Sequence, residues 1–182
     1  MNQRQSAVAA CTVALALVAS RTGAQGIPFS QHAELAQRVA YTDIAVSYNR
    51  PTARGRVIYG DSGIVKWGKV WHPGADSATR ITFSRAVTFE GRALAAGSYT
   101  LWTIPRERGT WTVIVNSQGH VFHTPYPGEA TDVFRVEVTP ERGPHMESLA
   151  YYFPAVARDS TLLRLHWGET IIPMHIRVRT DP

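Results

Sequence analysis

The sequence predicts an all-β fold, a β-sandwich or jelly-roll-like single domain of about ten short strands. Apolar and polar residues alternate with a period of two along most of the chain, which is typical of strands with one buried face. Gly, Pro and Asp-Ser clusters interrupt these runs at short intervals, as turns do. Only residues 31–40 have a spacing that would also suit a helix.

Residues 1–24 are expected to be a secretory signal peptide, which leaves residues 25–182 as one domain. Arg4 precedes an apolar run over residues 6–19 that is too short for a membrane-spanning helix. A lipoprotein signal is the alternative, because the residues before Cys11 resemble a lipobox, but too little apolar sequence precedes that cysteine. The sequence therefore predicts a periplasmic or extracellular protein without a lipid anchor.

Cysteine content and charge exclude several classes of function. Cys11 is the only cysteine, so the mature domain has no disulfide, no Cys-ligated zinc and no Cys nucleophile. The net charge is +5, and it falls to +3 once Arg4 and Arg21 leave with the signal peptide. The arginines are scattered singly, unlike the basic stripe of a nucleic-acid-binding protein. No later run is apolar and long enough to span a membrane.

The N-terminal half of the domain has clear alternation. Leu35 and Val39 are spaced as on a helix, but Leu35, Gln37 and Val39 also alternate, and a strand over residues 31–40 is the preferred interpretation. Glu90-Gly91 has the composition of a hairpin turn. Further strands are expected at residues 44–48, 81–83, 87–89, 99–103 and 111–115.

The C-terminal half is expected to close the fold as a meander. Asp159-Ser160 and Gly168-Glu169 are its predicted turns. Pro173 indicates an edge strand or a bulge, since proline has no N–H to donate to a neighbouring strand within a sheet. The apolar or alternating runs are Val121-Phe122 and residues 133–138, 149–153, 162–167 and 171–178.

Two stretches without alternation, residues 51–76 and 123–132, are rich in Gly and Pro and are predicted to be loops. Loops on a rigid β scaffold are where binding residues usually lie. In the first loop, aromatic side chains stand beside polar donors, which is typical of sugar and peptide sites. The sequence therefore predicts a ligand site in and beside this loop, composed of Arg50, Trp67, Trp71, His72 and Asp76.

Two motifs resemble enzyme signatures but lack the required context. Gly63 to Lys69 spells G-x-x-x-x-G-K, yet Val70 replaces the Ser or Thr that holds Mg²⁺, and no strand–helix unit surrounds it. Gly60 to Gly63 reads Gly-Asp-Ser-Gly, as in the nucleophile loop of trypsin-like proteases, but no base or oxyanion hole accompanies it. Ordinary turns explain both, and no catalytic residue is assigned.

A metal site is weighed and not assigned. His120 and His123 are three residues apart, and on a strand this spacing directs the two rings to opposite faces. In a loop, they would be able to converge with His72 on a metal ion. The alternative is that all three are surface or hydrogen-bonded histidines. No metal or other cofactor is predicted.

Several motifs in order resemble a bacterial family called domain of unknown function 2911. Tyr48-Asn-Arg-Pro51 and Gly55 to Gly60 are similar to its Y-S-R-P and K-G-R-x-I-F-G patterns. Gly68-Lys-Val-Trp71, Leu94 to Ile104 and Trp111 to Asn116 are similar to G-K-V-W, L-x-A-G-x-Y-x-L-x-T-I-P and W-x-V-I-x-N. The resemblance implies an exported, mostly β domain and brings no catalytic residue.

The stretch Lys69 to Asp76 departs from that family pattern at two positions. His72 stands where Arg or another polar residue is usual, and Asp76 stands where Asn is expected. These two residues are therefore expected to adjust what this member contacts. Pro73-Gly74 within the stretch is a candidate type II turn, in which Gly takes a positive φ.

Three functions are compatible with these features. The preferred one is a secreted or periplasmic binding module for a small molecule, glycan, peptide or envelope component. The second is a structural or assembly role in the cell envelope, through strand edges. The third is a hydrolase in which His72 and Asp76 act as an acid–base pair. The absence of a recognisable nucleophile or metal set favours a non-enzymatic role.

Overall fold

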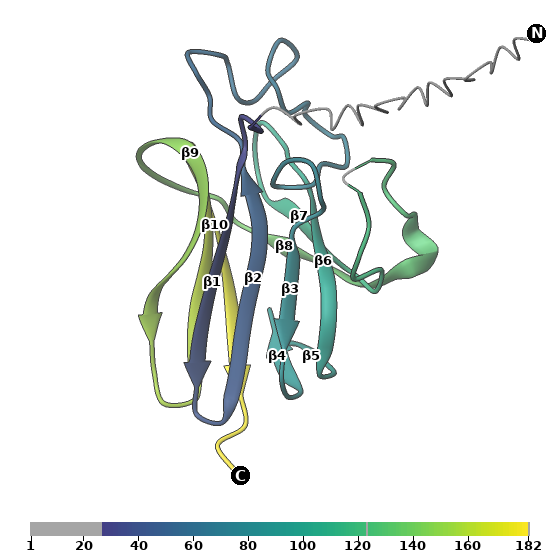
Figure 1. Cartoon of the computed structure of the whole chain (residues 1–182), viewed down its shortest axis with the longest axis vertical. Helices are drawn as coiled ribbons and strands as arrows, with labels where there is room; N and C mark the ends of the chain where they lie inside the picture. The colour runs from purple at the N-terminus through teal and green to yellow at the C-terminus, as the bar shows by residue number, and fades with distance from the viewer. Residues whose placement is uncertain (1–26, 123, 182) are drawn as a thin grey trace, which may run out of the picture.

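The computed structural model describes residues 27–122 and 124–181, and it consists of two antiparallel sheets packed against each other (Figure 1). The predicted all-β sandwich is confirmed. The predicted signal peptide lies outside the described residues. The strands are β1 Gln31–Val39, β2 Thr42–Arg50, β3 Arg80–Phe83, β4 Val87–Phe89, β5 Arg92–Leu94, β6 Gly97–Ile104, β7 Trp111–Asn116, β8 Asp132–Val138, β9 Glu141–Val156 and β10 Ser160–Val178.

Helical structure in the described residues is limited to one short 3₁₀ turn, η1 Glu129–Thr131. No helix in this part of the chain has the length and apolar character needed to cross a membrane.

One sheet has the strand order β1-β2-β3-β6-β7-β8 and the other has β5-β4-β10-β9. Their facing sides form the main core. In β2, Ile44, Val46 and Tyr48 are buried in this core, whereas the residues between them point to the outer face. The alternation that predicted the strands thus also separates a core face from an outer face.

The segment with ambiguous spacing is a strand. β1 pairs with β2 over its whole length, from Gln31 opposite Arg50 to Val39 opposite Thr42. A two-residue turn connects them, and Ala40 in this turn has φ 48°. The predicted hairpin at Glu90-Gly91 is confirmed between β4 and β5, where both residues have positive φ, as a type I′ turn requires.

Strand β10 turns back on itself. Nineteen extended residues would span about 60 Å, yet the N–H of Val178 donates to the carbonyl of Asp159 at 2.8 Å, so the two ends of β10 lie together. Gly168, with φ +59°, lies between two register shifts near the middle of the strand. Pro173 lies between the stretch that pairs with β9 and the stretch that pairs with β4, so its missing N–H interrupts neither pairing.

The long loop between β2 and β3 closes one end of the sandwich (Figure 1). Tyr59 is its central residue, and its ring contacts four indoles, those of Trp67, Trp71, Trp111 and Trp167, at centroid distances of 5.3–6.3 Å. Because Trp111 and Trp167 belong to opposite sheets, the loop joins the two sheets through aromatic packing.

A second, smaller core lies on the outer face of the six-stranded sheet. Ala78, Trp102 and Ile114 are buried there under Val121 and Tyr126. The covering residues come from the connection between β7 and β8, which folds over β6 and β7. This connection therefore projects from the outer face of the six-stranded sheet and forms a wall on it.

Candidate functional site

The outer face of β1, β2 and β3 carries a groove of about 440 Å³. A second hollow of about 290 Å³ shares Glu34, Ser47 and Arg80 with it, so the two form one elongated groove along the strands. Segments far apart in the sequence contribute to the lining, which includes His32, Glu34, Ser47, Asn49, Arg80 and His120.

Strand register places the polar floor residues together. His32 is paired with Asn49, and Glu34 is paired with Ser47, across β1 and β2. Ser47 is in turn paired with Arg80 of β3. Directly opposed residues on neighbouring strands share one face of a sheet. The floor therefore presents imidazole, carboxylate, amide, hydroxyl and guanidinium groups to the same space.

The wall of the groove is formed by two loops that pair with each other. Ser77 and Phe122 form an isolated β-bridge, and the N–H of Ala78 donates to the carbonyl of Val121 at 3.0 Å. Gly119 rests against β6, where a Cβ would come within 3.0 Å of the carbonyl oxygen of Ser98. Phe122 is 60% exposed and lies in the lining of the groove.

A chain of hydrogen bonds runs through His32. The amide Nδ2 of Asn49 donates to Oδ2 of Asp76 at 3.1 Å, and Oδ1 of Asn49 lies 3.0 Å from Nδ1 of His32. Nε2 of His32 lies 3.2 Å from Oε1 of Glu34. The two ring nitrogens of His32 thus face two oxygen acceptors, one of an amide and one of a carboxylate.

Glu34 is the acid at the centre of the groove. The hydrogen bond from His32 holds the pKa of Glu34 below its usual value, and hydrogen bonding to Ser47 and the nearby charges of His32 and Arg80 act in the same direction. Its carboxylate is therefore a fixed negative charge and a hydrogen-bond acceptor at neutral pH.

The guanidinium of Arg80 has a different kind of partner. Its Nη1 lies 3.0 Å from Nδ1 of His120. Because a guanidinium only donates, Nδ1 of His120 must accept, and this ring is neutral with its proton on Nε2. Arg80 thus contacts a neutral imidazole, and His120 keeps one N–H donor at Nε2.

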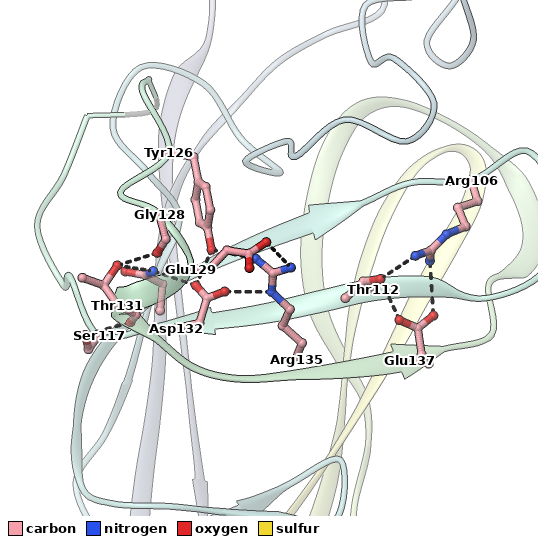
Figure 2. Close-up of polar contacts among 11 residues, drawn as sticks. Arg106, Thr112, Ser117, Tyr126, Gly128, Glu129, Thr131, Asp132, Arg135 and Glu137 are labelled. Carbon is pink, nitrogen blue, oxygen red and sulfur yellow. Dashed lines mark hydrogen bonds and ion pairs between the residues drawn. The ribbon is translucent and has the colours of Figure 1, made fainter.

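A network around Asp132 anchors the loop that forms the wall (Figure 2). The side chain of Asp132 is 7% exposed and accepts from Nε of Arg135 at 2.8 Å, from Nδ2 of Asn116 at 2.8 Å, and from the hydroxyl of Tyr126. Burial, followed by the bond to Asp132, raises the pKa of Tyr126, and the bond to Asp132 raises the pKa of Arg135. Glu129 also pairs with Arg135 at 2.9 Å.

Asn116 connects this network to the start of the loop. Its Nδ2 donates to Oγ1 of Thr131 at 2.8 Å, and its Oδ1 accepts from the N–H of Gln118 at 3.0 Å. Ser117 donates from its backbone and its hydroxyl to the carbonyl of Thr131, each at 2.9 Å. These bonds fix both ends of the 117–131 loop, so the groove wall that it carries has a defined position.

A further polar cluster, which includes Arg106, Thr112 and Glu137, lies along the same face (Figure 2). The hydroxyls of Thr110 and Thr112 each donate to the Glu137 carboxylate at 2.6 Å, and these bonds lower the pKa of Glu137. Arg106 pairs with Glu137 at 3.2 Å and borders a hollow of about 420 Å³ that Trp67 also lines.

The five residues predicted from sequence are distributed over several places. Nε of Arg50 donates to the carbonyl of Leu149 at 2.9 Å, which ties β2 to β9. Trp67 stacks on Tyr59 at 5.7 Å and lines the hollow beside Arg106. Trp71 stacks on Trp167 at 6.0 Å between the sheets.

The remaining two predicted residues differ in burial. His72 is 4% exposed, and its ring packs against Trp102 at 5.8 Å. Asp76 is exposed and accepts from Asn49, which lines the groove. Of the five, Asp76 therefore joins the polar network of the groove, and Trp67 belongs to the separate hollow beside Arg106.

The predicted type II turn at Pro73-Gly74 is wrong. Positive φ falls on Asp76, at 60°, and not on Gly74. The N–H of Gly74 donates to the carbonyl of His72 at 2.9 Å, which closes a three-residue turn around Pro73. Gly74 is needed for space, because a Cβ there would come within 2.7 Å of both His72 Nε2 and Thr79 Oγ1.

The metal hypothesis is tested only in part, because His123 lies outside the described residues. Within residues 27–122 and 124–181, no group of three or more His, Cys, Asp or Glu side chains is placed to hold a metal ion. His120 instead contacts Arg80.

The sequence reasoning missed His32, Glu34, Asn49 and Arg80. These residues lie in regular strands, where alternating polar side chains are usually interpreted as the solvent-exposed face of a sheet. One signal was present. If a hairpin with its turn at residues 40–41 is assumed, His32 and Glu34 face Asn49 and Ser47, but the alternation alone does not locate that turn.

Comparisons with known proteins give one result. A family model described as protein of unknown function (DUF2911) matches residues 30–176, which includes every residue that lines the groove. No curated protein and no solved structure matches the chain.

Proposed function

The chain belongs to the DUF2911 family, and we propose that it is an exported binding module that holds a glycan in the groove on the outer face of β1, β2 and β3. The observation that carries this proposal is the convergence of His32, Glu34, Asn49, Arg80 and His120 on one elongated groove. Export rests on the signal-peptide pattern of residues 1–24.

The position of the groove favours a glycan over an extended peptide. Peptides that add a strand to a sheet need an open edge with unpaired backbone groups. The groove lies over the face of the sheet, where β2 is already paired with both β1 and β3. Side chains, and not backbone groups, therefore meet the ligand, as is usual for sugar hydroxyls.

The chemistry of the lining fits a ligand with many hydroxyl groups. Glu34 and Asp76 supply acceptors, and the separate pair of Arg80 and His120 supplies donors, in and beside the same groove. The exposed ring of Phe122 at the wall offers an apolar face for a sugar ring. The continuation of the groove past Arg80 gives room for more than one sugar unit.

Two of the residues predicted from sequence keep a contact role in this proposal. Asp76 orients Asn49 and His32, and Trp67 offers an aromatic surface in the separate hollow beside Arg106. Arg50, Trp71 and His72 support these sites by holding the strands and loops in place.

Equilibrium binding of the mature domain to a glycan panel, followed by titration calorimetry with the best ligand, tests the proposal. Arg80→Ala is expected to weaken binding about tenfold or more, because a charged hydrogen-bond partner is lost. Arg142→Ala is the matched control, since Arg142 is an exposed arginine of β9 in the other sheet. The proposal fails if no glycan binds, or if both variants lose affinity equally.

Two further measurements distinguish a binding function from the hydrolase and structural alternatives. Incubation of the bound oligosaccharide with the protein, followed by product analysis, is expected to show no cleavage. Cleavage that is lost in Glu34→Gln would make the protein a hydrolase. A defined oligomer in size-exclusion chromatography with light scattering, without glycan binding, would favour the structural role.

A further inference from the structure

The arginine in the outer-face groove has an imidazole as its side-chain partner, since Nη1 of Arg80 lies 3.0 Å from Nδ1 of His120. Six other arginines contact a carboxylate within 3.2 Å, namely Arg38, Arg106, Arg135, Arg142, Arg164 and Arg179. Among the described residues, the positive charge of Arg80 is not matched by a carboxylate in direct contact.

The acid nearest to Arg80 in the groove is already engaged. Glu34 accepts from His32, and hydrogen bonding to Ser47 also acts on its pKa. Asp76, beside the same groove, accepts from Asn49. The two acids thus have hydrogen-bond partners on His32 and Asn49, whereas the guanidinium of Arg80 and the Nε2–H of His120 present donors only.

From this division we infer that the glycan bound in the groove carries a carboxylate, as a uronic acid does, and that this carboxylate binds to Arg80. A guanidinium offers two parallel N–H donors that match the two oxygens of a carboxylate. The hydroxyl groups of the sugar then meet the acceptors of Glu34 and Asp76. This inference rests on the proposed glycan-binding function and specifies its ligand class.

The test compares acidic oligosaccharides with their neutral counterparts. Titration calorimetry measures binding of a set of oligouronates and of the same oligomers after reduction of each carboxyl group to an alcohol. Wild type is expected to prefer the acidic form about tenfold or more, because a charge-assisted bidentate contact is lost on reduction. Affinity for the acidic form is also expected to fall as salt concentration rises, since the contact is partly exposed.

Substitutions at Arg80 assign the preference to this residue. Arg80→Gln is expected to bind the acidic and the reduced forms equally. Arg80→Lys keeps the positive charge but loses the planar pair of N–H donors. It is therefore expected to keep only part of the preference for the acidic form. Arg142→Gln is expected to behave like wild type. Thermal unfolding checks that each variant is folded, and Arg80→Lys still tests the inference if Arg80→Gln is not.

The outcomes separate this inference from the proposed function. Equal binding of acidic and reduced glycans by wild type, with loss of both in Arg80→Ala, overturns the uronate inference and leaves glycan binding in place. An acidic preference that persists in Arg80→Gln also overturns it. Absence of binding to every glycan in the panel overturns the proposed function itself.

Discussion

At the scale of single residues, hydrogen-bond chemistry decides what each side chain in the groove does. The ring nitrogens of His32 face an amide oxygen and a carboxylate, both of which accept. His120 faces a guanidinium, which only donates, so its Nδ1 accepts. Two histidines in one groove therefore differ in hydrogen-bonding role because their neighbours differ, and their sequence context alone does not distinguish them.

Asp132 is expected to be the residue whose loss most disturbs the groove wall. Asp132→Ala leaves Arg135 and Asn116 without their shared acceptor. Arg135 keeps Glu129, so the loss is that of hydrogen bonds to a charged group, about 1.5–3 kcal/mol of unfolding free energy. Chemical denaturation measures the loss, and hydrogen exchange is expected to quicken in residues 117–122. Glu129→Gln is the control, because its exposed pair with Arg135 contributes less than about 1 kcal/mol. Equal effects of the two changes would contradict this account.

Glu137 is expected to contribute to acid sensitivity. The Thr110 and Thr112 hydroxyls lower its pKa in the folded state, so its stabilising contribution is present above the unfolded-state pKa and is lost as pH falls through the folded-state pKa. Because its side chain is half exposed, the contribution is below about 1 kcal/mol. Urea denaturation of wild type and Glu137→Gln is expected to show a stability difference at pH 6 that shrinks by pH 3. A difference that does not change with pH would contradict this.

At the scale of elements, turns that need positive φ determine how neighbouring strands are joined. The turn at Glu90-Gly91 was predictable because it contains glycine, whereas the β1–β2 turn places Ala40 at φ 48° and gives no such signal. Gly168 was predicted to be a turn, and its positive φ near the middle of β10 is consistent with the reversal of that strand. The register shifts beside it depend on pairing with β9, which a local pattern does not reveal.

Substitution of Gly91 tests the need for positive φ in the β4–β5 turn, separately from any steric clash. Its φ is +75°, and a Cβ there would meet no heavy atom within 4 Å. Gly91→Ala is therefore expected to lower the free energy of unfolding by about 1 kcal/mol through backbone strain alone. Gly91→Asn is expected to cost less, because asparagine tolerates this conformation. Thermal unfolding of both variants provides the comparison, and a larger loss for Asn than for Ala would refute the strain argument.

At the scale of the whole molecule, the aromatic loop joins the two sheets at one end. Trp167 is 1% exposed in β10, and Trp71 of the loop stacks on it at 6.0 Å. Tyr59 contacts both rings and also Trp111 of the other sheet. The residues that looked like a ligand platform in the sequence thus contribute to packing between the sheets, and this packing positions β2 and β3 at the groove.

A double-mutant cycle measures this link. Trp167→Ala is expected to lower the free energy of unfolding by about 3–5 kcal/mol, because a large buried ring is removed. Trp71→Ala is expected to show a coupling energy with Trp167→Ala of about 0.5–1.5 kcal/mol, as stacked aromatic pairs do. Chemical denaturation of the two single variants and the double variant gives the value. Additive effects would show that the stacking contributes nothing beyond burial.

The sequence by itself determined the class of fold, since side chains that alternate along a strand can bury only one face. That physical rule predicted the all-β sandwich and most strand positions, and ordered motifs predicted the family. The groove was decided by tertiary structure alone. Alternation says which face a residue occupies, but it does not say which strand lies beside it or which loop covers it. His32, Asn49, Arg80 and His120 share a groove only because strand register and the folded 117–131 loop bring distant segments together.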